Sequence, residues 1–163
     1  MNFPARTWVL SLLGIGVLVG LMFPKPSCQW PREPILAGLA ARDLKLAIAA
    51  FHLEYHEYPL LDPANDVTTD SGPVLMDILL GSDAHKAPGG RNPRGIAFFI
   101  EARGASAFQD PWGNHFRVRF DTNADKQIEN PEAPGTFLPK PIAIWSAGPD
   151  GDFNTWKDNV KSW

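Results

Sequence analysis

The sequence has little of several features that mark common classes of protein. It contains one cysteine, Cys28, which excludes an intrachain disulfide. Its formal net charge is -3, from 15 basic and 18 acidic residues, so it has no excess of positive charge for binding nucleic acid. It also lacks a Ser/His/Asp grouping, a phosphate-binding loop and a redox pair. We therefore expect no catalytic residues, no enzymatic activity, no small-molecule substrate and no nucleic-acid partner.

The composition is that of a folded chain rather than a disordered one. Hydrophobic residues make up 44% of the 163 residues, which is enough for one domain with a core and an appendage. Sixteen prolines and fourteen glycines indicate many turns and argue against a helical bundle.

An uncharged apolar run near the N-terminus predicts a membrane anchor. Residues 7–23 carry no charge and lie between Arg6 and Lys25, after a short tail of residues 1–6. A membrane-spanning helix needs roughly 17–25 apolar residues, so this run is just long enough. We expect a single-pass protein of the inner (cytoplasmic) membrane with its C-terminal domain periplasmic. The alternatives are a cleaved signal peptide and, because of Cys28, a lipoprotein.

A linker rich in proline separates the predicted anchor from the predicted domain. Four prolines fall within residues 24–34, and proline removes a backbone donor and clashes with the preceding helical turn. This stretch is therefore predicted to be a stiff, extended spacer. The globular domain is predicted to occupy residues 35–163.

The first part of this domain has a helical pattern. Between residues 35 and 58, apolar side chains recur at steps of three and four, which is typical of one face of a helix. Pro59 is expected to end this helix. Ser71-Gly72-Pro73 is a start signal for a second, short helix over residues 74–80 that ends at Gly81. The apolar face of the long helix is formed by Leu44, Ile48, Phe51, Tyr55 and Tyr58.

Three later segments have the pattern of strands. They are residues 95–101, 115–121 and 141–145, and turn-rich segments separate them. We predict an α+β fold in which the long helix packs on a three-stranded antiparallel sheet.

Blocks of sequence resemble a known family. Tyr55–Pro59 (YHEYP), Asp110–Asn114 (DPWGN), Ser146–Gly151 (SAGPDG) and Asp158–Trp163 (DNVKSW) are similar, in order and spacing, to segments of the G-type pseudopilins of type II secretion systems. The resemblance implies a structural or assembly role in a secretion or related pilus system. It also implies partners among other pseudopilins or secretion-machinery proteins, and a C-terminal loop that binds calcium.

The N-terminus departs from that family, which leaves an alternative function open. Residues 1–23 contain no acidic residue and nothing that resembles the prepilin peptidase site. The alternative is a stand-alone, membrane-anchored extracytoplasmic domain that binds calcium and does not polymerise.

The DPWGN block is expected to have a structural role. Asp110 can accept hydrogen bonds within its own turn, Pro111 fixes φ, and Gly113 allows a positive φ. Trp112 is predicted to insert into the core. The resemblance adds Trp163 as the aromatic residue that closes the C-terminal loop.

The C-terminal loop contains the first candidate calcium site. Calcium takes six to eight oxygen ligands, and this loop offers several hydroxyl, amide and carboxylate side chains. The resemblance assigns ligand positions to Ser146, Asp150, Asp158 and Asn159, and the loop adds Asp152. The alternative is a solvated acidic turn.

A second candidate calcium loop follows the second predicted strand. Its spacing fits the ligand positions of an EF-hand loop, D-x-[DN]-x-[DN]-G-x₅-E, except that Lys126 stands where the motif has glycine. A lone calcium loop and an acidic hairpin turn are both compatible with this pattern. The ligands would be Asp121, Asn123, Asp125, Gln127 and Glu132.

His52 and His56 are four residues apart on the predicted helix and could share a zinc ion. No third ligand is identifiable in the sequence, so ordinary surface histidines are the preferred interpretation.

Overall fold

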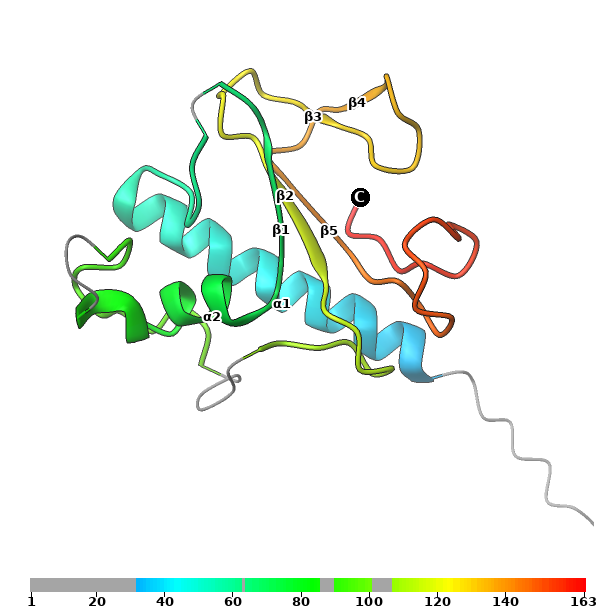
Figure 1. The fold of residues 1–163 in the computed structure, drawn as a ribbon, viewed down its shortest axis with the longest axis horizontal. Coiled ribbons are helices and arrows are strands. Elements are labelled where there is room, and N and C mark those ends of the chain that lie inside the picture. Colours follow the sequence, from blue (N-terminus) through cyan, green and yellow to red (C-terminus); the bar gives the residue numbers. More distant parts are fainter. Residues whose placement is uncertain (1–31, 63, 86–89, 101–106) are drawn as a thin grey trace, which may run out of the picture. The chain divides into compact units, whose positions relative to one another are not determined.

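The computed structural model describes residues 32–62, 64–85, 90–100 and 107–163 (Figure 1). Residues 31–163 form a compact unit of their own. The predicted tail, the predicted anchor over residues 7–23 and all but the end of the predicted linker lie outside the described residues. In the part of the chain that is described, no helix is both long and apolar enough to cross a membrane.

The long helix α1 runs over Arg32–Tyr55, three residues earlier at each end than predicted. Its start includes Pro34, which is tolerated there because the first turn of a helix leaves its N–H groups unbonded. Its end is set by His56, which adopts a left-handed conformation (φ 57°) and donates its N–H to the carbonyl of His52 at 2.8 Å. That arrangement is a common helix C-cap and ends the helix before Pro59 is reached.

The sheet is antiparallel and three-stranded, in the order β1 (Val67–Asp70), β2 (Arg117–Phe120), β5 (Ile142–Trp145). In its register, Phe120 is opposite both Val67 and Ile142. The predictions of strands within residues 115–121 and 141–145, and of an α+β fold with a long helix and a three-stranded antiparallel sheet, are therefore confirmed. The predicted strand at residues 95–101 is wrong, because β1 takes its place in the sheet.

Residues 95–100 are irregular because the buried side chain of Asn92 organises them as a loop. The amide of Asn92 donates to the carbonyls of Ile78 and Ile96 (2.7 Å each), and its oxygen accepts from the Ile96 N–H and the Tyr55 hydroxyl. Phe98 then donates its N–H to the carbonyl of Leu79. The apolar side chains of this segment reach the core through loop packing rather than through a strand.

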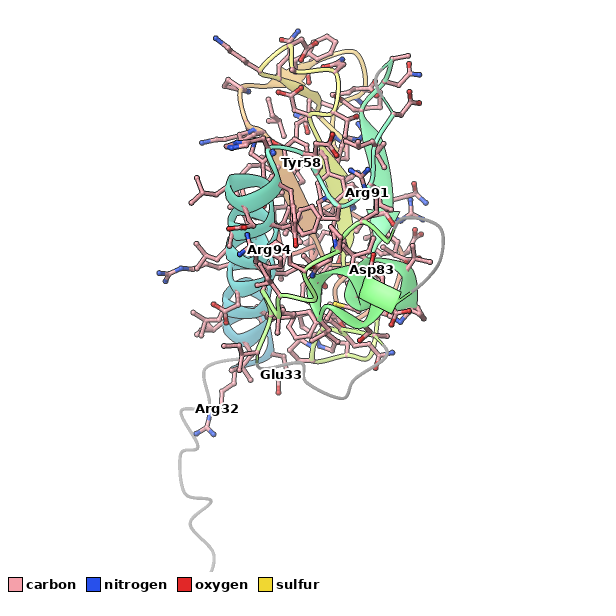
Figure 2. The ribbon with its side chains drawn as sticks, turned by 90° about the vertical axis from the view of Figure 1, so that its left-hand side faces the viewer. Arg32, Glu33, Tyr58, Asp83, Arg91 and Arg94 are labelled. Atoms are coloured by element: carbon pink, nitrogen blue, oxygen red, sulfur yellow. The ribbon has the colours of Figure 1, made fainter. Side chains whose placement is uncertain are left out.

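The core lies between α1 and one face of the sheet, as Figures 1 and 2 show from two directions. Leu44, Ile48 and Phe51 on α1 are completely buried, as the apolar pattern predicted. They meet Val118 and Phe120 of β2, which point from the sheet toward the helix.

The remaining elements are short. The second helix, α2 (Pro73–Leu79), begins at the predicted Gly-Pro signal and is followed by Gly81 at φ 78°. The other elements are the 3-10 helix η2 (Ser82–His85) and a two-stranded ribbon of β3 (Ile128–Glu129) and β4 (Phe137–Leu138).

The free edge of β5 is covered by residues 160–162. Ser146 donates its N–H to the carbonyl of Val160, and Ser162 donates its N–H to the carbonyl of Ile144. Trp145 and Lys161 form an isolated antiparallel bridge between these contacts. The segment that ends the chain is thus held against the sheet.

Candidate functional site

The DPWGN turn and the C-terminal loop are joined by hydrogen bonds. One oxygen of the buried Asp110 carboxylate accepts the N–H groups of Trp112 and Asn114, and the other accepts the hydroxyl of Ser146. Asn114 donates its side-chain amide to the carbonyl of Gly148 at 3.0 Å. The DPWGN block and the SAGPDG block of the sequence therefore form one hydrogen-bonded unit.

The turn has the geometry that its sequence predicts, except for its tryptophan. Gly113 has φ 89°, as expected from its place in the turn. The prediction that Trp112 inserts into the core is wrong, because Trp112 is only half-buried and lies outside the core cluster. The core position next to the turn is filled by Phe116, which is completely buried.

Trp163 belongs to a separate aromatic cluster. Its ring centroid lies 6.0 Å from that of Trp145 and 6.3 Å from that of Trp156, and these two rings are 6.3 Å apart. The cluster packs the end of the C-terminal loop against β5. The role of Trp163 in closing a calcium-binding loop stays a prediction.

At the base of the C-terminal loop, two side-chain oxygens are buried without a hydrogen-bond partner. They are Oδ1 of Asp158 and Oδ1 of Asn159, a residue with an exposed fraction of only 8%. Backbone and side-chain atoms of Asp158 lie against Gly148, leaving no room for a Cβ there. Buried oxygens without a donor are costly, and oxygens of these types are ones that a cation can bind.

The tip of the same loop has a different character. Asp150 accepts the N–H of Asp152 at 2.9 Å, and Asp152 accepts the N–H of Asn154 at 2.9 Å. Both carboxylates are exposed. The loop therefore contains exposed, self-bonded carboxylates at its tip and unsatisfied buried oxygens at its base.

Only part of the predicted ligand set comes together. Ser146 and Asp158 both adjoin Gly148, which donates its N–H to the Ser146 hydroxyl at 3.0 Å. The carboxylates of Asp150, Asp152 and Asp158 do not form one cluster, and the described residues contain no group of three or more His, Cys, Asp or Glu side chains placed to hold a metal. Binding through this loop would need the tip to fold toward the base, or backbone carbonyls as additional ligands.

In the second candidate loop, the side chains bond to their own backbone. Asp121 is buried and accepts the N–H groups of Asp125 (3.1 Å) and Lys126 (2.9 Å). Asn123 accepts the N–H of Asp125, and Asp125 accepts that of Gln127. Lys126 adopts φ 68°, the left-handed conformation that the motif requires of its glycine.

Glu132, the last residue of that ligand pattern, interacts with a residue outside the loop. Its carboxylate forms an ion pair with Lys161 at 2.6 Å. In the second loop, oxygens of Asp121, Asn123 and Asp125 therefore accept backbone N–H groups of the loop, and Glu132 pairs with Lys161.

Sequence analysis missed a residue beside this loop. Oδ1 of Asp66 is buried without a hydrogen-bond partner. Burial raises the pKa of the Asp66 carboxyl above its ordinary value, the Glu129 N–H opposes this rise, and the carboxylates of Asp121 and Asp125 add to it. Asp66 comes from a segment remote in sequence, so loop spacing gave no signal for it.

The two histidines of the predicted pair lie at and just beyond the end of α1. His52 lies in the last turn of α1 with its ring stacked on Tyr58 (centroids 4.4 Å apart), while His56 lies just beyond the helix. No third ligand joins them in a metal-binding cluster among the described residues.

Comparisons of this chain with protein-family models, with curated proteins and with solved structures found no match.

Proposed function

We propose that this protein is a non-enzymatic, pseudopilin-like structural component of a type II secretion system or a related pilus system. Its domain would assemble with other pseudopilin-like subunits through the outer face of α1. The proposal rests on the resemblance of the sequence blocks, and the observation that carries it is an exposed apolar stripe on that helix.

The stripe lies on the side of α1 that faces away from the sheet. Ile35, Leu39, Leu46 and Leu53 follow one another at spacings of four, seven and seven residues, which keeps them on one side of a helix. Their exposed fractions range from 49% to 76%, and Leu36 beside them is 52% exposed. Five large apolar side chains exposed on one helix are unusual for a monomeric domain and typical of an interface.

Disrupting the stripe tests the proposal. We expect L46E combined with L53E to reduce sharply the cross-linked oligomers of the full chain in the membranes of its own cells. The melting temperature should change little, because both side chains are exposed. F137E is a matched control, since Phe137 is 56% exposed on β4, away from α1. Unchanged cross-linking in the stripe variant would contradict assembly through α1.

A second candidate function is supported by the C-terminal loop. We propose that the loop binds calcium, either in the assembling subunit or in a stand-alone anchored domain. The supporting observation is the pair of buried, unpartnered oxygens of Asp158 and Asn159. Calcium prefers carboxylate and amide oxygens of this kind. The cross-linked oligomers could be unchanged in the stripe variant while calcium raises the melting temperature of the unsubstituted protein. The stand-alone domain would then be the better proposal.

A further inference from the structure

The face of the sheet opposite α1 is hollowed on either side of one arginine. A hollow of about 250 Å³ is bounded by side chains of all three strands, and a second hollow of about 360 Å³ adjoins it. Arg117 and Phe153 belong to both. Side chains that line the first hollow include Thr68, Arg119, Glu129, Trp145 and Trp156.

Arg117 carries a charge that no carboxylate neutralises at ion-pair distance within the described ranges. Its guanidinium carbon lies 4.4 Å from the centre of the Phe153 ring, which holds the group in place by a cation–π contact. Asp70 is opposite Arg117 in the register of β1 and β2, and it lies on the side of the second hollow. Arg117 therefore borders both hollows and has no ion-pair partner among the described residues.

Arg119 adds a second guanidinium in a fixed orientation. Its Nε donates to the Thr68 hydroxyl at 2.8 Å, and its Nη1 donates to the carbonyl and carboxylate of Glu129 at 2.8 and 3.3 Å. Its Nη2 donates to no acceptor among the described residues. Two arginines and one glutamate are the charged residues that line the hollow, in a chain whose net charge is -3.

The wall also contains apolar rings beside its polar groups. Trp145, Trp156, Pro131 and Pro134 contribute ring surfaces to the hollow. Of the polar side chains beside them, Asn130 accepts the N–H of Glu132, and the Asn154 amide donates to Asp152. A carboxylate next to an apolar side chain would match both the guanidinium groups and the ring surfaces of this wall.

We propose that this hollow binds an acidic peptide segment of a partner protein, with a carboxylate on Arg117 and Arg119 and an adjacent apolar side chain against Trp156. Guanidinium groups hold carboxylates with paired, charge-assisted hydrogen bonds. The site lies on the opposite side of the sheet from the stripe of α1, so it does not depend on assembly through that helix.

The test uses two capped hexapeptides and the full chain in detergent micelles. One peptide has the sequence Ser-Leu-Glu-Leu-Glu-Ser, and the other has glutamine in place of both glutamates. Binding is followed by NMR of the indole N–H groups of Trp145 and Trp156. We expect the glutamate peptide to bind about tenfold or more tightly than the glutamine peptide, the factor typical of losing one charged hydrogen bond.

R117Q should abolish most of that preference, and R42Q, an exposed arginine on α1, should leave it intact. Equal binding of the two peptides, no binding of either, or an R117Q protein that keeps the preference would overturn the proposal. Tighter binding of an oligoglucuronate than of the glutamate peptide would overturn the choice of a peptide as the ligand.

Discussion

The two acidic loops, residues 121–132 and 146–159, both contain several Asp and Asn residues but use the side-chain oxygens differently. In the first loop, the buried carboxylate of Asp121 is satisfied by two backbone N–H groups of its own turn. In the second loop, the buried oxygens of Asp158 and Asn159 accept no hydrogen bond. The spacing of acidic residues therefore does not distinguish a structural turn from a cation site. The two differ in which side-chain oxygens accept hydrogen bonds from backbone N–H groups.

The largest expected difference between the loops is their response to calcium. The full chain in detergent should melt several degrees higher in calcium than in chelator, since a ligand that binds only the folded state adds about 2.7 kcal/mol at a hundredfold excess over Kd. D158A should remove most of this shift, because it deletes a buried oxygen at the base of the loop. Identical melting curves in calcium and in chelator would contradict a site in either loop.

D121A should destabilise the protein in the same way with and without calcium. It removes the acceptor for the N–H groups of Asp125 and Lys126, and losing such a buried acceptor costs about 1–3 kcal/mol. Chemical denaturation in the two buffers measures this cost. A cost present only in calcium would mean that Asp121 is a metal ligand and that the comparison between the loops is wrong.

W112A should lower the free energy of unfolding by less than the roughly 3–5 kcal/mol that is typical of replacing a completely buried aromatic residue by alanine. Trp112 is half-buried outside the core, whereas Phe116 nearby is completely buried. F116A is the matched comparison, and denaturant midpoints of the two variants should differ clearly. Equal destabilisation would show that the DPWGN turn packs more tightly than its exposure indicates.

The smallest expected effect is that of D66N, and its sign depends on pH. The folded-state pKa of Asp66 is raised, so its protonated form favours the folded state, and this contribution is lost as pH rises through that pKa. In chelator, D66N should therefore raise the melting temperature slightly at neutral pH. The difference should vanish below the ordinary pKa of 3.8. A loss of stability at neutral pH would show that Asp66 has a partner when ionised, such as a cation shared with Asp121.

The parts of the fold that follow local rules were predictable from the sequence. The inner face of α1 was visible in the spacing of Leu44, Ile48 and Phe51, and the start of α2 in its Gly-Pro pair. The strand β1 was not, because its four residues (VTTD) give too short a pattern. The run at residues 95–101 was more apolar than β1, yet the hydrogen bonds of Asn92 hold residues 95–100 as a loop.

The sequence predicted only those parts of the candidate sites that are formed by residues close together in the chain. The turn at Asp110 and the loop geometry around Asp121 follow from residue types that bond to their own backbone. Asp66, the hollow at Arg117 and the exposed stripe of α1 depend on which surfaces the sheet covers. The sequence shows which residues are present and how far apart they are along the chain. It does not show which of them the fold buries, pairs or leaves exposed.

The position of β2 in the sheet has a consequence for how the chain folds. β2 is the central strand, yet it follows β1 only after a long intervening segment, and a hydrogen bond between Ser71 and Phe116 already closes a loop of 45 residues. Pairing over such distances slows folding, because chain entropy is lost before the contacts form. The helix α1 can form early from local contacts, while the sheet must wait for residues 117–120. Until then both edges of β1 are unpaired, whereas in the folded sheet one of them pairs with β2, so the incomplete chain is the form more prone to aggregate.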